Sequence, residues 1–152
     1  MDTIDRDIIN QLVVDARMTY QDLGRAVRLS ANTVAERVRR LRDSGVISGY
    51  RAQVDLGRLG HGLHIVADIR LREGADRAEF ERGLPDVAQV VGAVRLTGEY
   101  DFLLDLACVD AADLEEVIDR LKGDHGVRES HSRLVLHEVS LGVGRLVSAR
   151  QP

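Results

Sequence analysis

LSANTVAERVRRL, residues 29–41, is the second of two short amphipathic segments that meet at a tight turn within residues 19–47. Ser30 is a good residue to cap a helix at its N-terminus. At about 100° per residue, the apolar side chains of such a helix fall within one narrow stripe, formed by Val34, Val38 and Leu41. Polar side chains occupy the opposite side, so one face packs and the other is available for contact. This pattern is typical of a helix-turn-helix.

In a helix-turn-helix, the second helix places the residues after its cap against base edges in the major groove of DNA. The candidates for contact are the polar residues from the cap onward: Ser30, Asn32, Thr33, Glu36, Arg37, Arg39 and Arg40. A charge run on a helix usually indicates only a solvated face, so the context has to decide between the two interpretations.

Two further helices predicted upstream favour DNA binding. The first has Ile4, Ile8, Leu12 and Val13 on its inner face, and the second is capped by Thr19 with Leu23 and Val27 inward. Three helices suffice for a small core ahead of the exit at residues 45–47. The sequence therefore predicts a three-helix head.

Charge is distributed unevenly along the 152 residues, whose net charge is −4. Residues 1–51 hold nine basic and seven acidic residues, a net charge of +2, and from Arg17 onward the balance there is eight to three. Residues 52–152 hold 12 basic and 18 acidic residues, a net charge of −6. A basic head on an acidic body indicates a DNA-binding module joined to a part that does not contact DNA.

Several protein classes are disfavoured by composition. The single cysteine, Cys108, rules out an internal disulfide framework, suits a reducing compartment, and is expected to be a buried strand residue. No stretch approaches the roughly 18 consecutive apolar residues of a membrane span, and residues 1–5 lack a signal-peptide pattern. We expect a cytoplasmic protein without a membrane partner.

The order of elements changes after residue 48. An extended stretch leads to glycines within residues 56–62, which mark a linker and a domain boundary. Periodicity then predicts strands over residues 64–71, 87–96, 100–108 and 127–139, with helices over residues 77–84 and 110–122. The order β-α-β-β-α-β predicts a ferredoxin-like domain with helices on one face of an antiparallel sheet.

The predicted fold class is therefore α+β. The predicted domains are a helix-turn-helix, winged-helix-like domain over residues 1–48, an extended linker over 49–60, a ferredoxin-like domain over 61–141 and a C-terminal tail over 142–152.

Two predicted strands carry apolar residues on both faces. Strand 100–108 has Phe102, Leu104, Leu106 and Cys108 on one face and Leu103, Ala107 and Val109 on the other. In strand 87–96 the two apolar sets are Val87, Val91 and Ala93, and Ala88, Val90 and Val94. One helical layer covers only one face, so we expect a large exposed apolar patch on the second face, where two subunits would pack sheet against sheet.

Four stretches together resemble the Lrp/AsnC (feast/famine, leucine-responsive regulatory protein) family of bacterial and archaeal transcriptional regulators. They are IDRDII at residues 4–9, the segment at residues 29–41, GVISGY at residues 45–50 and TGEYDFLL at residues 97–104. The resemblance covers nearly the whole chain. Family recognition segments often carry prolines after the cap serine, whereas this chain has Ala31 and Thr33, so the operator sequence stays open.

The resemblance implies a dimer that assembles further, commonly to octamers, and a small effector, usually an amino acid, bound near the turn at residues 97–101. The implied effector contacts are Thr97, Gly98, Glu99, Tyr100 and Asp101. Glycine permits close backbone approach, neighbouring N–H groups can receive a carboxylate, and Asp101 can accept an ammonium. By position alone, Arg95, Lys122 and Ser132 are further candidates. From the residues alone, a plain hairpin turn at Gly98 is favoured.

An enzyme is not expected, and neither is a cofactor or a metal. His131 and His137 would lie about 20 Å apart on one strand, too far to share one ion. The carboxylates at the start of the 110–122 helix fit the helix dipole better than catalysis. The alternative to a regulator is an amino-acid-sensing or protein-interaction module whose head binds no operator. Retention of a basic face at Arg37, Arg39 and Arg40 favours the regulator.

Overall fold

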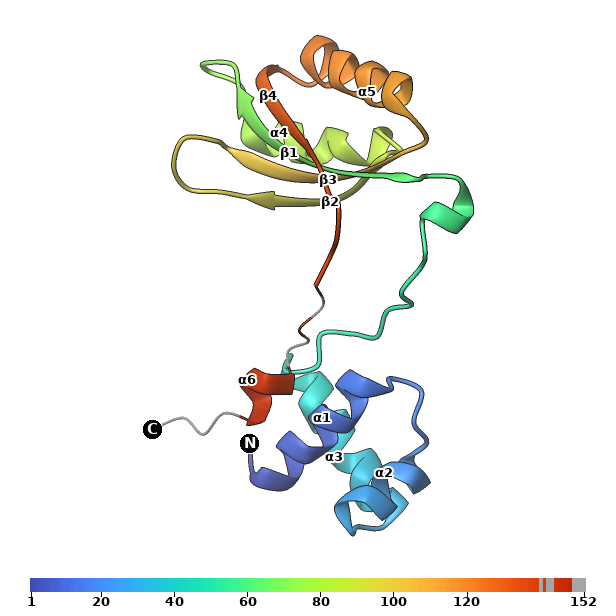
Figure 1. Cartoon of the computed structure of the whole chain (residues 1–152). Coiled ribbons are helices and arrows are strands. Elements are labelled where there is room, and N and C mark those ends of the chain that lie inside the picture. The colour runs from blue at the N-terminus through green and yellow to red at the C-terminus, as the bar shows by residue number, and fades with distance from the viewer. Residues whose placement is uncertain (140, 142–143, 149–152) are drawn as a thin grey trace. The chain divides into compact units, whose positions relative to one another are not determined.

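The computed structural model describes residues 1–139, 141 and 144–148, and these form two compact units (Figure 1). The first, the helical unit, contains residues 1–53 and the described residues from 139 onward. The second, the sheet unit, spans Val54–Glu138. Among the described helices, none is both long and apolar enough to cross a membrane.

The helical unit opens with three helices, α1 (Thr3–Val14), α2 (Tyr20–Val27) and α3 (Ala31–Asp43). Each begins after a capping side chain: Asp2 for α1, Thr19 for α2 and Ser30 for α3. The Thr19 and Ser30 caps confirm the predicted helix starts.

The turn between α2 and α3 depends on two backbone features. Arg28 ends α2 in the left-handed region, with φ of 58°. A Cβ on Gly24 would lie 2.6 Å from the carbonyl oxygen of Leu29, so only glycine allows the two segments to approach this closely.

The core of the helical unit contains the apolar stripe predicted for α3 together with residues of α1 and α2: Ile8, Ile9, Leu23, Val34, Val38 and Leu41. Val13 was expected to point inward, but it is 41% exposed near the end of α1, so this expectation is wrong. The region predicted as a tail contains a short helix, α6 (Gly144–Ser148), which contacts α1 and packs Val147 against the core. Residues 140, 142–143 and 149–152 lie outside the described ones.

The sheet unit has the predicted β-α-β-β-α-β order. A 3₁₀ turn, η1 (Gly57–Leu59), precedes its elements, which are β1 (Leu63–Leu71), α4 (Arg77–Gly83), η2 (Leu84–Asp86), β2 (Val90–Arg95), β3 (Phe102–Cys108), α5 (Ala111–Asp124) and β4 (Val127–Leu134). The strands form an antiparallel sheet in the order β2-β3-β1-β4, and α4 and α5 cover one face (Figure 1). Phe80, Val117 and Leu121 of the helices pack there against strand residues such as Leu104.

Three strand boundaries differ from the prediction by two residues or more. The strand expected from residue 87 begins at Val90, because Val87 and Ala88 belong to the turn after η2. The strand expected from residue 100 begins at Phe102. The strand expected to reach residue 139 ends at Leu134, so His137 lies beyond it.

The face of the sheet away from the helices, the open face, is not the apolar patch that was expected. The strand register places alternate residues of β1 on this face, and three of them are polar: His64, Asp68 and Arg70. Three polar contacts link neighbouring strands there: His64 with Asp105, Asp68 with Arg133, and Arg70 with Glu129. The expectation failed because it weighed two strands by their apolar residues, without Asp105 and without the charged side chains of β1 and β4.

Candidate nucleic-acid interface and effector loop

The outer face of α3 carries most of the predicted DNA contacts. Six of the seven candidates are exposed, namely Ser30, Asn32, Thr33, Glu36, Arg39 and Arg40. The Ser30 hydroxyl accepts the backbone N–H of Thr33 at 3.1 Å, and its oxygen lies 2.8 Å from the Thr33 hydroxyl. These two residues therefore fix the start of α3 in addition to being exposed there.

Arg39 is paired along its own helix. Its Nη2 donates to both carboxylate oxygens of Glu36, at 2.7 and 2.6 Å, and about two thirds of each side chain is exposed. Exposed pairs of this kind contribute about 0–1 kcal/mol, so a phosphate can displace the carboxylate at small cost. An open hollow on the same face is lined by Tyr20, Asn32, Ala35, Glu36, Arg39 and Arg42. Sequence reasoning missed Tyr20 and Arg42, although Arg42 follows Arg39 at helical spacing.

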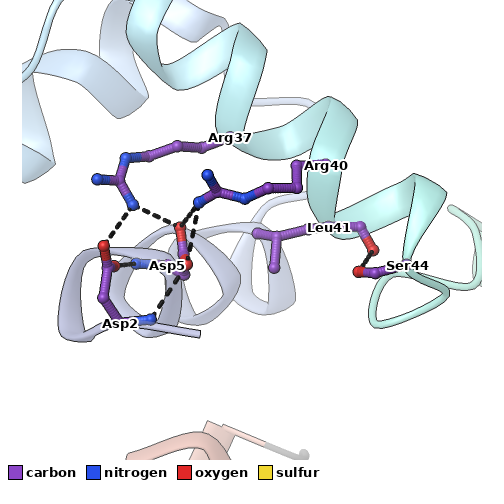
Figure 2. Close-up of polar contacts among 6 residues, drawn as sticks. All are labelled: Asp2, Asp5, Arg37, Arg40, Leu41 and Ser44. Atoms are coloured by element: carbon purple, nitrogen blue, oxygen red, sulfur yellow. Dashed lines mark hydrogen bonds and ion pairs between the residues drawn. The ribbon is translucent and has the colours of Figure 1, made fainter.

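Arg37 is the candidate that the structure places differently. Only 20% of its side chain is exposed, and its Nη1 donates to carboxylate oxygens of both Asp2 and Asp5, each at 2.7 Å (Figure 2). Arg40 also approaches Asp5, at 3.3 and 3.4 Å, but its side chain is 61% exposed. The two arginines therefore share one acidic partner and differ in their access to solvent.

The loop between β2 and β3 is the predicted effector site. The N–H of Leu96 donates to the carbonyl oxygen of Asp101 at 2.8 Å and closes the loop. Gly98 adopts a φ of +110°, and a Cβ there would meet no atom within 4 Å, so glycine is needed for the backbone angle and not for space. Thr97 and Glu99 are exposed and Tyr100 is partly buried.

Arg70 of β1 joins this loop to the sheet. Its guanidinium donates to the carbonyl and the carboxylate of Glu99, at 3.0 and 2.7 Å, and lies 5.2 Å from the centre of the Tyr100 ring. The hydrogen bond to the Glu99 carboxylate is the main cause that raises the pKa of Arg70. Sequence reasoning did not include Arg70 among the site residues, although it falls at a polar position of an alternating strand.

Asp101 is held inside the fold. Its carboxylate accepts the N–H of Leu71 at 2.9 Å and the guanidinium of Arg77 at 2.6 and 3.1 Å, and 17% of the side chain is exposed. The Leu71 hydrogen bond, with Arg77 beside it, keeps the pKa of Asp101 below its usual value despite partial burial. The observed role of Asp101 is to hold the loop against β1 and α4, and an ammonium contact remains a prediction.

The three additional effector candidates lie in different places. Arg95 ends β2 next to the loop and is exposed. Lys122 is exposed on α5, where its carbonyl oxygen accepts a hydrogen bond from Arg72, the residue after β1. Ser132 lies on the edge strand β4 opposite Ala67, with β1 between it and β3. The structure therefore does not bring Ser132 to the loop.

The described residues offer no group of three or more His, Cys, Asp or Glu side chains that could hold a metal ion. Cys108 is fully buried at the end of β3, as predicted, and burial is the main cause that raises the pKa of its thiol. The thiol is therefore poorly placed to act as a nucleophile.

Both units are similar to known proteins. Residues 1–42 match the family model of the AsnC-type helix-turn-helix domain, and residues 65–143 match the Lrp/AsnC ligand binding domain. The chain is 31% identical to the HTH-type transcriptional regulator Rv2324 of Mycobacterium tuberculosis over 136 residues, which is 90% of this chain and 92% of that protein. It is 33% identical to the Bkd operon transcriptional regulator of Pseudomonas aeruginosa over 114 residues, or 74% of each chain.

A solved structure extends this similarity to the whole fold. The crystal structure of a transcriptional regulator from Neisseria meningitidis in complex with L-Met superimposes with a TM-score of 0.86 at 28% identity. The superposition covers 95% of both chains.

Proposed function

The chain belongs to the Lrp/AsnC family of DNA-binding transcriptional regulators, and we propose that it recognises operators with the outer face of α3 and responds to an amino acid at the 97–101 loop. The observation that carries this proposal is the division of α3 into a buried apolar stripe and an exposed polar face that begins directly after the Ser30 cap. A helix divided in this way can pack on its own unit and still enter a major groove.

On this proposal, Asn32, Thr33 and Glu36 lie near base edges. Arg39 and Arg40 contact phosphates or base edges, with Arg39 exchanging its Glu36 partner for DNA. Support comes from their exposure and from the weak pairing of both arginines. Ser30 caps the N-terminus of α3, where the positive end of the helix dipole favours a phosphate oxygen.

An amino acid is the proposed effector because the loop offers groups for both ends of a zwitterion. Backbone N–H groups around Gly98 can receive a carboxylate, and Arg95 adds positive charge beside them. Glu99 and Asp101 are the acidic groups proposed to accept the ammonium, in addition to their contacts with Arg70 and Arg77. The relative from Neisseria meningitidis was solved with L-Met, which supports an amino acid as ligand for this chain as well.

The function can be tested with a DNA duplex that the full chain selects from a random-sequence pool. We expect a defined duplex to be enriched, and we expect its affinity or the size of the complex to change when one of the common amino acids is added. Electrophoretic shift measures the affinity, and calorimetry identifies the amino acid. Amino-acid binding without duplex selection would instead indicate a sensing module that binds no operator.

We further propose a homodimer, assembling to a higher oligomer such as an octamer, with the open face of the sheet as the contact between two subunits. The face carries Val66, Val94 and Leu103 among its polar contacts, so apolar side chains and complementary charges are both available. Leu103→Asp would bury an unpaired carboxylate and should produce smaller species in sedimentation. Leu59→Asp, the same substitution at an exposed position of η1 outside the sheet, is the matched control.

A further inference from the structure

We propose that Arg37 does not contact DNA but positions α3, because Asp2 and Asp5 clamp its guanidinium to the start of α1. This inference rests on the proposed operator binding by α3. Arg37, Asp2 and Asp5 form one cluster of ion pairs, called here the N-terminal clamp. The exposed residues of α3 are then the ones that contact DNA.

The two aspartates of the clamp first organise each other. The N–H of Asp5 donates to Oδ1 of Asp2 at 2.8 Å, and the N–H of Asp2 donates to Oδ2 of Asp5 at 3.1 Å, a reciprocal capping box. Each carboxylate thereby has one oxygen committed to the backbone. The other oxygen of each, Oδ2 of Asp2 and Oδ1 of Asp5, accepts Nη1 of Arg37 at 2.7 Å.

Arg37 lies 35 positions after Asp2 and 32 positions after Asp5 in the sequence. The clamp therefore connects the start of α1 with the middle of α3 (Figure 2). The side chain of Asp5 is only 3% exposed, and Asp5 is the one buried charged residue among those described. A buried carboxylate is stable only while its oxygens stay paired, so detaching Arg37 for a phosphate would leave Asp5 poorly compensated.

Arg40 supplies an internal comparison, since it lies three residues further along α3 and approaches the same carboxylate. Its Nη2 stands 3.3 and 3.4 Å from the Asp5 oxygens, against 2.7 Å for Nη1 of Arg37. The Arg40 side chain is 61% exposed and that of Arg37 is 20% exposed. Arg40 can therefore turn to a phosphate while Arg37 keeps Asp5 paired. One arginine fixes the helix and the other is available to DNA.

Both contacts of the clamp are made by one nitrogen of Arg37, so a lysine at this position should be able to replace the arginine, whereas a glutamine should not. A lysine ammonium carries three N–H donors and can bridge two carboxylates, whereas the amide of glutamine carries no charge. Arg37→Lys should therefore preserve the clamp, and Arg37→Gln should open it. Arg40→Gln is the matched control, because it removes the same group from an exposed position on the same helix.

The experiment measures the affinity of the three full-length variants for the duplex selected by the wild type, across a salt titration, together with their melting temperatures. Arg40→Gln should lower the salt slope by about one and barely change the melting temperature. Arg37→Gln should weaken binding on the order of tenfold, the size of one misplaced base contact, with an unchanged salt slope and a lower melting temperature. Arg37→Lys should restore both affinity and melting temperature.

A salt slope lowered by about one in Arg37→Gln would overturn the proposal, whatever its melting temperature, and make Arg37 a phosphate contact. Unchanged affinity in Arg37→Gln, or an Arg37→Lys variant as weak as Arg37→Gln, would also overturn it. If the wild type selects no duplex, operator binding itself fails, and amide exchange then decides the clamp. Faster exchange at the start of α1 and in α3 for Arg37→Gln but not for Arg37→Lys would support positioning, and equal exchange in both would refute it.

Discussion

The helical unit and the sheet unit each hold an aspartate that pairs with an arginine close to the segment proposed to bind a ligand. In the helical unit, Asp5 is buried and its partner Arg37 lies on the helix proposed to contact DNA. In the sheet unit, Asp101 lies in the effector loop and its partner Arg77 is the first residue of α4. Both carboxylates also accept a backbone N–H. In both units, therefore, a charge near the proposed ligand-binding segment holds that segment in place.

The two units differ in how their other charged side chains are paired. On the outer face of α3, Arg39 pairs with its helical neighbour Glu36, an exposed contact that another anion can replace. On the open face of the sheet, ion pairs connect neighbouring strands, as between Asp68 and Arg133. The first arrangement is suited to exchanging partners with DNA, whereas the second makes a face whose charges are already complementary.

The largest expected effect tests whether the two units are energetically separate. Among the described residues their cores share no side chain, with Leu23 in one and Leu104 in the other, both fully buried. Leu104→Ala and Leu23→Ala should each lower the free energy of unfolding of their own unit by about 2–5 kcal/mol. Amide exchange should show the loss of protection confined to the mutated unit. Equal loss in both units would contradict the comparison.

The second prediction concerns the acid stability of the two paired aspartates. Burial alone would raise the pKa of Asp5, but the hydrogen bonds from Arg37 and the Asp2 backbone outweigh it and lower that pKa below its ordinary value, and the pKa of Asp101 is lowered too. Because both folded-state pKa values lie below the unfolded ones, the stability they contribute is present above about pH 4 and is lost as the pH falls through the folded values.

Urea denaturation from about pH 6 to about pH 2 provides the measurement. Asp5→Asn and Asp101→Asn should each unfold more easily near neutral pH, by about 1–3 kcal/mol for the loss of charged hydrogen bonds, and depend less on acid pH than the wild type. Asp55→Asn, in an exposed pair with Arg58, is the control and should change neither. If the unfolding free energy of both Asp5→Asn and Asp101→Asn fell with acid as steeply as that of the wild type, groups other than these two aspartates would cause the acid sensitivity.

The third prediction separates holding from binding at the effector loop. If Asp101 only holds the loop, Arg77→Gln and Asp101→Asn should weaken the response to the amino acid to a similar extent, because the asparagine oxygen can still accept the Leu71 N–H. If Asp101 also accepts the ammonium, Asp101→Asn should lose about 1–3 kcal/mol more binding free energy than Arg77→Gln, since a charged hydrogen bond is removed. Calorimetry with the effector identified for the wild type distinguishes the two results, and basal DNA affinity should change little in either variant.

Much of the helical unit was predictable because its pattern is local. The caps Thr19 and Ser30 and the stripe Val34, Val38 and Leu41 all follow from residues close together in the chain, and the structure confirms them. The clamp was not predictable in this way. Asp2 and Asp5 look like an ordinary acidic first turn, and Arg37 looks like part of a solvated face until α1 and α3 pack together.

In the sheet unit, the features that the sequence did not predict depend on contacts between residues far apart in the chain. Its element order was correct, but the character of its open face depends on which strands become neighbours. Asp105 meets His64 and Asp68 meets Arg133 only once the order β2-β3-β1-β4 is known. Counting apolar residues strand by strand therefore overestimated the apolar surface. Arg70 and Arg77 were not identified at the effector loop for the same reason, since they reach it from other elements.

The smallest expected effect concerns the ion pair between Arg133 and Asp68 on the open face. The Arg133 side chain is 54% exposed and that of Asp68 is 17% exposed, so for a single subunit Arg133→Gln should change the free energy of unfolding by less than about 1 kcal/mol. If two subunits pack through this face, water is excluded from the pair and the loss grows, because the unpaired Asp68 would then be buried between subunits.

Folding and association are linked, so in that case the difference in unfolding free energy between Arg133→Gln and the wild type should increase with protein concentration. Denaturation at two concentrations, combined with sedimentation, measures this, and Arg58→Gln in an exposed pair outside the sheet serves as the control. A difference that stays below about 1 kcal/mol at every concentration, in a protein that sediments as a dimer, would place the subunit contact on another surface and leave the charges of the open face to solvent.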